Sequence, residues 1–224
     1  MAPRRTLATT LRLVEDEAEY VVMTSDPIYQ ERMVHKGWRP SDHATFVRRF
    51  AAPTDIERIH ENFKRHLEEM LLQSARMSPV RWEEALEEFL RRQAGTGLRW
   101  WLYGSGALAV RGLDVQPGDL DLAVDDATHA GALLDDLLVE PVTKMPNWVA
   151  WWGGGAFCGA ILEWLSDPRP EYEPHEQGVA ARDRLETVTW RDWEVPVPPL
   201  DLQLAIALKR GLADRAAIIS EAMA

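Results

Sequence analysis

The stretch between residues 99 and 124 constrains the fold more than any other part of this chain. It reads RWWLYGSGALAVRGLDVQPGDLDLAV, in which a β-prone run ends at Gly104-Ser105 and a short apolar helix closes at Gly112. After the turn VQPG, a second β-prone run extends over residues 119–124. Strands and helices mixed in this order predict an α+β (α/β) fold with a mixed β-sheet flanked by helices.

The residues before this stretch predict a small α/β module. Alternating β-prone runs, a turn-like RPSD segment and an apolar stripe with a capping pattern occur there. The predicted elements are strands at 20–24 and 44–50 and helices at 26–37 and 54–71. We therefore expect an N-terminal module of unknown role at residues 1–75, followed by a second domain at residues 76–224.

The second domain is predicted to include a lead-in helix and C-terminal helices around its sheet. The lead-in helix covers residues 79–93, with Ser78 as its N-cap and Pro79 in its first turn. The glycine run WGGG at 152–155 predicts a flexible turn. The other predicted elements are helices at 127–138 and 200–210 and strands at 148–152, 159–165, 186–190 and 193–197.

Composition narrows the class of protein. With 36 acidic and 25 basic residues the formal charge is -11, so the molecule as a whole repels polyanions. The single cysteine, Cys158, cannot form an internal disulfide or a cysteine-based metal cluster, which suits a reducing compartment. Apolar runs fall short of the roughly 18 residues that a membrane span requires. We therefore expect a cytoplasmic protein that does not associate with membranes.

Asp119 and Asp121 form the pattern on which the functional interpretation depends. Two residues apart on a predicted strand, their carboxylates leave the same face of the sheet. Adjacent like charges need a cation to offset their repulsion, and carboxylate oxygens suit magnesium. Gly104-Ser105 joins a strand to a helix N-terminus, where backbone N–H groups favour a phosphate. Phosphates beside magnesium ligands indicate phosphoryl or nucleotidyl transfer.

The same residues resemble a known family signature. YGS, thirteen further residues and DLDL are similar to the signature of the DNA polymerase β nucleotidyltransferase superfamily. That signature is a hydrophobic residue, Gly-Ser, a spacer and Asp-hydrophobic-Asp-hydrophobic. The stretch from Trp100 to Asp126 is more similar still to the minimal and antibiotic-modifying branch, such as aminoglycoside and lincosamide nucleotidyltransferases, and to toxins of the abortive-infection class. The resemblance covers about residues 97–219 and implies a nucleotidyltransferase fold.

The resemblance implies further site residues. The family places a third acid on a neighbouring strand, and Glu163 in GAILEW has the required hydrophobic-acid-hydrophobic setting, although Asp is more usual there. It implies that Asp119, Asp121 and Glu163 are catalytic residues and metal ligands, with Glu163 as general base. The nucleotide-binding residues would be Gly104, Ser105 and Lys209.

These features predict a metal-dependent enzyme that transfers a nucleoside monophosphate, with AMP preferred, from a nucleoside triphosphate to an acceptor hydroxyl and releases pyrophosphate. Two Mg²⁺ ions are expected, with Mn²⁺ as the alternative metal. The acidity of the chain favours a small-molecule acceptor over nucleic acid or protein, and the N-terminal module is a candidate surface for a homodimer or a partner. Two alternatives stay open: a toxin that uses this chemistry on RNA or protein, and a binding protein that kept the fold without turnover.

Overall fold

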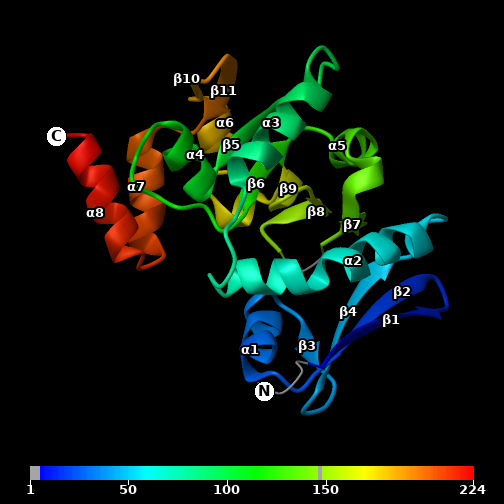
Figure 1. The fold of residues 1–224 in the computed structure, drawn as a ribbon. Coiled ribbons are helices and arrows are strands. Elements are labelled where there is room, and N and C mark those ends of the chain that lie inside the picture. Colours follow the sequence, from blue (N-terminus) through cyan, green and yellow to red (C-terminus); the bar gives the residue numbers. More distant parts are fainter. Residues whose placement is uncertain (1–5, 146–147) are drawn as a thin grey trace.

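The computed structural model describes residues 6–145 and 148–224 of the chain. Within these ranges the molecule has a small N-terminal sheet and a larger mixed sheet, with helices on both sides of the larger one (Figure 1). The predicted α+β class with a mixed sheet flanked by helices is confirmed. Each helix in the described ranges is too short or too polar to cross a membrane.

The N-terminal module is an antiparallel sheet covered by two helices. Its strand order is β1-β2-β4-β3. Asp26 caps the first helix by accepting a hydrogen bond from the Ile28 N–H at 2.8 Å. The strand over residues 7–14 was not expected from the sequence, because it is an edge strand with mostly exposed side chains and carries only a weak burial signal. The elements are β1 (Leu7–Val14), β2 (Glu17–Thr24), α1 (Pro27–His35), β3 (Arg39–Pro40), β4 (Thr45–Ala51) and α2 (Ile56–Ser74).

Helix α2 joins the N-terminal module to the rest of the molecule. In Figure 1 it lies between the N-terminal sheet and strands β7 (Leu138–Lys144) and β8 (Ala150–Phe157). The Asn62 side-chain amide donates to the carbonyls of Asp136 and Leu138, at 2.9 and 3.1 Å. Phe63 of α2 also shares one buried cluster with Val139 of β7. The two parts of the chain therefore have a common core.

The larger sheet has the strand order β5-β6-β9-β8-β7. Strands β6 and β9 are parallel, whereas the other neighbouring pairs are antiparallel. Helices α3 and α5 lie on one side of the sheet and the N-terminal module lies on the other (Figure 1). Besides β7 and β8, this part of the chain contains α3 (Trp82–Gln93), β5 (Trp100–Tyr103), α4 (Gly104–Val110), β6 (Leu120–Val124), α5 (Ala127–Leu133), a 3-10 turn (Asp135–Leu137) and β9 (Ile161–Pro168).

Trp164 of β9 occupies the centre of the core under α3 and α5. Its side chain is fully buried, and its indole N–H donates to the Ala127 carbonyl at 3.1 Å. A Cβ at Gly154 would lie 2.5 Å from the Trp164 ring, so only glycine leaves room for it. The prediction of a turn at 152–155 is therefore wrong. The glycines belong to strand β8, and one reason for them is the bulky ring on the next strand.

Other boundaries also differ from the sequence predictions. The helix expected at 79–93 with Ser78 as N-cap begins instead at Trp82 with Arg81 as N-cap, and the Arg81 N–H donates to the Gly159 carbonyl. The helix expected at 127–138 ends at Leu133, and the chain turns into the edge strand β7. Pro141 is tolerated within β7 because an edge strand leaves one side of its backbone unpaired.

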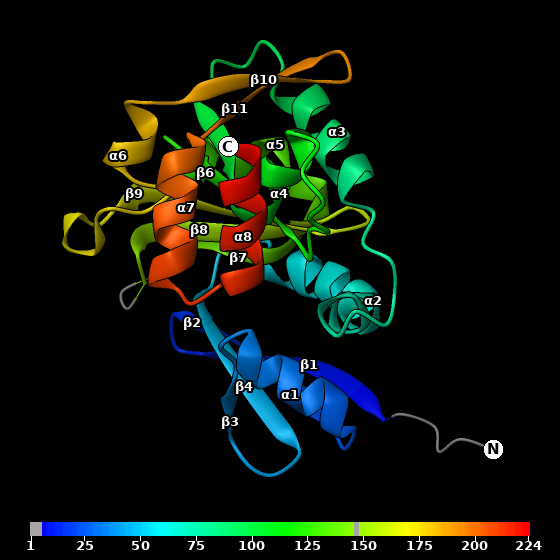
Figure 2. The same ribbon diagram turned by 90° about the vertical axis from the view of Figure 1, so that its left-hand side faces the viewer.

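The C-terminal segment packs against α4. Figure 2 shows α7 and α8 side by side in front of the sheet, and Leu108 of α4 is buried against Ala207 and Ile219 from this pair. A short hairpin beside β5 precedes them. The elements are a 3-10 turn (Pro170–Tyr172), α6 (Val179–Arg182), β10 (Glu186–Trp190), β11 (Trp193–Val197), α7 (Leu200–Lys209) and α8 (Ala213–Ala222).

Candidate active site

A row of side chains crosses the larger sheet on the face toward the N-terminal module. In the strand register Tyr103 pairs with Asp121, Asp121 with Glu163, and Glu163 with Gly155, which in turn pairs with Glu140. Directly paired residues point to the same face of a sheet. The next residues along β6 and β9 point into the opposite core. The predicted acids Asp121 and Glu163 are thus brought together as parallel neighbours.

Asp119 stands immediately before β6 and extends this acidic row. Its carboxylate oxygen Oδ2 lies 2.7 Å from the Nζ atom of Lys36, a residue of the N-terminal module at the end of α1. The same Nζ lies 3.6 Å from Oε1 of Glu163. About a quarter of each side chain of the Lys36–Asp119 pair is exposed. Lys36 was not predicted as a site residue, because no local sequence pattern links residue 36 to residues 119 and 163.

The charges in the row shift the protonation equilibria of their neighbours. Burial raises the pKa of Asp121 well above its ordinary value, and the nearby charges of Asp119 and Glu163 raise it further, while Lys36 acts in the opposite direction. The pKa of Lys36 is raised by Glu163 and Asp119, although burial opposes this change. Burial and these acids also raise the pKa of Tyr103. The row is therefore a site of excess negative charge that favours a bound cation.

The donor chemistry of the row fits a hard divalent cation. Carboxylate oxygens from Asp119, Asp121 and Glu163 are the ligand type that magnesium prefers. Within residues 6–145 and 148–224, however, no three carboxylate, histidine or cysteine side chains are already gathered as a metal site. The Lys36 ammonium lies between Asp119 and Glu163 instead. Metal binding by these residues stays a prediction. A metal ion at Asp119 would have to displace the Lys36 ammonium from that carboxylate.

Gly104 brings the start of α4 against the acidic row. Its φ angle of +65° favours glycine, and a Cβ there would lie 2.9 Å from Oδ2 of Asp121. The Gly104 N–H donates to the carboxylate of Glu176 at 2.6 Å. The predicted phosphate donor is thus already paired with an acid in this structure. Ser105, the other predicted phosphate contact, follows it in α4 and is buried.

Substitution of Gly104 by alanine is expected to lower the free energy of unfolding by more than the same change at Gly112. Both glycines have positive φ, so each variant incurs a backbone cost of about 1–2 kcal/mol. Only at Gly104 does the new Cβ meet another group, the Asp121 carboxylate, since the space around Gly112 is open. Urea unfolding of the two variants measures the difference. Equal losses would contradict the close approach of α4 to Asp121.

Glu176 is a buried acid that the sequence analysis did not identify. Besides the Gly104 N–H, its carboxylate accepts a hydrogen bond from the Gln203 amide at 3.3 Å, and its backbone carbonyl accepts one from the Trp101 indole at 2.8 Å. Burial raises its pKa, while the Gly104 and Gln203 hydrogen bonds lower it. Glu176 therefore connects α4, β5 and α7 at one end of the acidic row.

Lys209, the third predicted nucleotide contact, forms no ion pair with the three predicted acids in the described part of the chain. It is exposed at the end of α7. Burial lowers the pKa of the His175 imidazole, and the charge of Lys209 lowers it further, while Glu173 acts in the opposite direction. His175 precedes Glu176, so Lys209 lies on the Glu176 side of the site. A role in binding the triphosphate stays a prediction.

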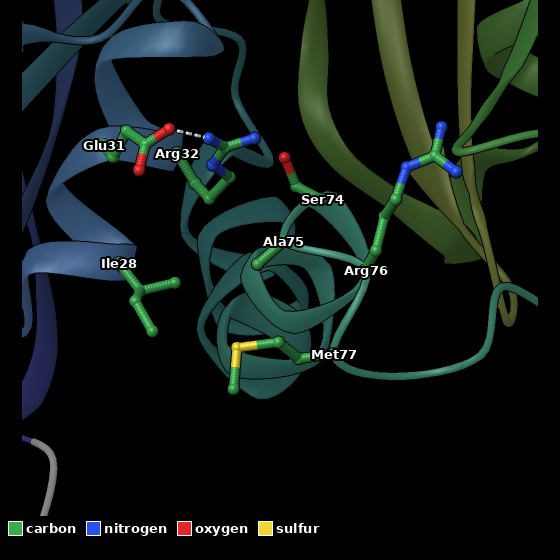
Figure 3. Close-up of a pocket in the computed structure, with 7 residues that line it drawn as sticks. All are labelled: Ile28, Glu31, Arg32, Ser74, Ala75, Arg76 and Met77. Carbon is green, nitrogen blue, oxygen red and sulfur yellow. Dashed lines mark hydrogen bonds and ion pairs between the residues drawn. The ribbon is translucent and has the colours of Figure 1, made fainter.

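Two hollows lie near the N-terminal module. The larger, of about 270 Å³, is on the outside between α1 and the end of α2, and Figure 3 shows the Glu31–Arg32 ion pair at its rim with Met77 opposite. None of its described lining residues belongs to the acidic row. The smaller, of about 50 Å³, is lined by both Lys36 and Glu163. The smaller hollow is therefore the one connected with the candidate site.

Comparison with known proteins gives structural likeness only. No protein-family model matches the chain, and no curated protein matches it by sequence. A suspected nucleotidyltransferase from Thermotoga maritima superposes with a TM-score of 0.49 and 20% identity, over 62% of this chain and 90% of that one. The lincosamide antibiotic adenylyltransferase LnuA, solved with lincomycin bound, superposes with a TM-score of 0.42 and 17% identity, over 57% of this chain and 86% of that one. Both matches are similarities of fold at low sequence identity.

Proposed function

We propose that this chain is a nucleotidyltransferase that moves a nucleoside monophosphate, preferably AMP, from a nucleoside triphosphate to an acceptor hydroxyl. The observation that carries the proposal is the parallel pairing of Asp121 with Glu163, with Asp119 beside them and Gly104 against them. This pairing brings Glu163, from a distant part of the sequence, beside Asp121 and its near neighbour Asp119. It does so next to the glycine-serine turn that the same chemistry requires for phosphates.

In the proposed reaction, Asp119 and Asp121 would hold magnesium, and Glu163 would complete the site. The acceptor oxygen forms a bond to the α-phosphorus, the bond from that phosphorus to the bridging oxygen breaks, and pyrophosphate leaves with the bonding electrons. Glu163 takes the proton of the acceptor hydroxyl. Two metal ions, if bound, would stabilise both the attacking and the leaving oxygen.

The triphosphate would bind at the start of α4. Ser105 and the Gly104 N–H would contact phosphate oxygens, and Lys209 would approach from the end of α7. Because the Gly104 N–H donates to Glu176 in this structure, a phosphate at that N–H has to replace the Glu176 carboxylate. The phosphate and the Glu176 carboxylate would therefore compete for the same Gly104 N–H.

Calorimetric titration tests this function. ATP, GTP, CTP and UTP are added to the wild-type protein with and without Mg²⁺, and the best case is repeated with Asp119→Ala plus Asp121→Ala. We expect magnesium-dependent binding that is lost in this double variant. The matched control is Asp114→Ala plus Asp125→Ala, which removes the same charge from exposed positions nearby and is expected to bind normally. A folded wild-type protein that binds no triphosphate under any metal condition would remove the enzyme proposal.

A second candidate function is that of a binding protein with a nucleotidyltransferase-like fold and no turnover. Two contacts favour it. Lys36 neutralises Asp119 where a metal would be needed, and Glu176 pairs with the predicted phosphate donor at Gly104. Under this alternative the titration above shows no magnesium-dependent binding.

A further inference from the structure

The smaller hollow lies between the N-terminal module and the acidic face of the larger sheet. Its volume is about 50 Å³. Most of its wall is apolar and comes from both parts of the chain, with α2 contributing the largest share. The apolar residues that form the wall include Trp38, Phe63, Leu67, Met70, Val139 and Ile161. One end of the hollow reaches Glu163, the acid that we propose as the base.

Gly155 explains why there is space beside Glu163. In the row across the sheet, Gly155 stands between Glu163 of β9 and Glu140 of β7, so the two acids are separated by a position without a side chain. A Cβ placed at Gly155 would have Glu140 Cβ as its nearest neighbour, at 3.4 Å, which is ordinary contact. The backbone therefore does not force glycine by a clash, and the missing side chain leaves an opening over the sheet.

The charged groups around the opening are already paired with one another. Arg48 of β4 forms an ion pair with Glu140 at 2.8 Å, and Lys36 lies between Asp119 and Glu163. The two acids that line the hollow, Glu140 and Glu163, therefore each have a cation beside them. Burying an unpaired charge in such an apolar wall would also be costly. An uncharged group is therefore the occupant that the opening suits.

We propose that the hollow over Gly155 binds the apolar substituent of a small, neutral, hydroxyl-bearing acceptor. This inference rests on the proposed function. A whole ligand of drug size needs roughly 300–1,000 Å³, and even benzene occupies a cavity of about 150 Å³, so only a few carbon atoms, such as the end of a branched alkyl chain, enter. The remainder of the acceptor stays at the mouth, where its hydroxyl meets Glu163.

This placement fits the direction of the reaction. With the apolar group held over Gly155, the neighbouring hydroxyl lies at the Glu163 end of the hollow. Its oxygen attacks the α-phosphorus, its proton passes to Glu163, and pyrophosphate leaves. The N-terminal module thereby gains a function: α2 and Trp38 form the wall that selects the acceptor, and specificity comes from the part of the chain outside the sequence signature.

The test uses 2-methyl-1-propanol and 3-methyl-1-butanol as probes, with glycerol as the polar comparison. Ligand-observed saturation-transfer NMR measures their binding to the full chain, as wild type and as Gly155→Ala and Gly155→Val. Valine suits a strand and fills the opening. We expect both apolar alcohols to bind the wild type and glycerol not to bind, with a weaker signal for Gly155→Ala and at least a tenfold loss of affinity for Gly155→Val. Ile161→Phe fills the hollow from β9 and serves if Gly155→Val does not fold.

Parallel calorimetry with ATP and Mg²⁺ separates this inference from the proposed function. Triphosphate binding that persists in Gly155→Val while alcohol binding is lost supports the acceptor site. Alcohol binding that is equal in the wild type and the filled variants, or absent from a wild type that binds triphosphate, overturns it. If the protein binds no triphosphate and the filled variants still lose alcohol binding, the hollow is an apolar binding site without a role as an acceptor site.

Discussion

Replacing Glu163 by glutamine is expected to reduce nucleotidyl transfer by about 10²–10⁴-fold, the usual contribution of a general base. Glutamine keeps the size of the side chain and one oxygen that can contact a metal, but it cannot accept the acceptor proton at neutral pH. Triphosphate affinity should therefore change much less than turnover. Pyrophosphate release in the presence of the neutral alcohols described above measures the rate, and calorimetry with ATP and Mg²⁺ measures binding.

Glu140→Gln provides the matched control for this variant. Glu140 belongs to the same row on the same face of the sheet, but it lies beyond Gly155 and pairs with Arg48. Its amide variant should lose far less activity than Glu163→Gln. Equal rates for the two variants would contradict the role of Glu163 as base, and loss of ATP binding as complete as in the double aspartate variant would make Glu163 a metal ligand only.

Replacing Lys36 by methionine is expected to destabilise the metal-free protein and to strengthen its response to Mg²⁺. Without the ammonium, Asp119 and Glu163 lose their nearest cation. The pair is partly exposed, so the expected loss in the free energy of unfolding is about 1–3 kcal/mol, between the values for surface and buried pairs. Methionine keeps the apolar stem that lines the hollow. Because Mg²⁺ no longer competes with the ammonium, its addition should raise the melting temperature of this variant more than that of the wild type.

Thermal unfolding with and without MgCl2, at constant ionic strength, measures both effects. Lys64→Met is the control, because Lys64 is an exposed residue paired only with Glu61 of its own helix among the described residues. It removes one positive charge far from the row and should leave the magnesium response unchanged. If Mg²⁺ shifts the melting temperatures of wild type, Lys36→Met and Lys64→Met by the same amount, the ammonium and the metal do not share a site.

The acids of the candidate site were easier to predict from the sequence than the groups around them, and their roles stay predictions. The acids Asp119 and Asp121 could be located because a strand periodicity of two and a glycine-serine turn act over a short stretch of chain. Glu163 required a family resemblance, and the parallel pairing of β6 with β9 places it beside Asp121. Lys36 was missed because its position depends on how the N-terminal module packs on the sheet, a tertiary effect that no local pattern contains.

Strands were missed or shortened in the predictions where much of the strand is exposed or where glycines stand at positions that usually carry larger side chains. The edge strands β1 and β7 expose much of their length or contain proline, which weakens the β signal. In β8, Gly154 is needed because the Trp164 ring lies against it, whereas Gly155 on the other face leaves an opening and is not required by a clash. A run of glycines usually indicates a turn, and only the neighbouring strand reveals the alternative.

The shared core around α2 affects how far the chain can be shortened from its N-terminal side without loss of stability. A fragment that begins after residue 75 would retain the Asp119–Asp121 strand and Glu163, but it would lose the helix that covers Val139 and Phe157. Those side chains would face water, and Asp119 would lack its ammonium neighbour. The larger sheet and the N-terminal module therefore share one buried core, and we expect a fragment that begins after residue 75 to be less stable than the full chain.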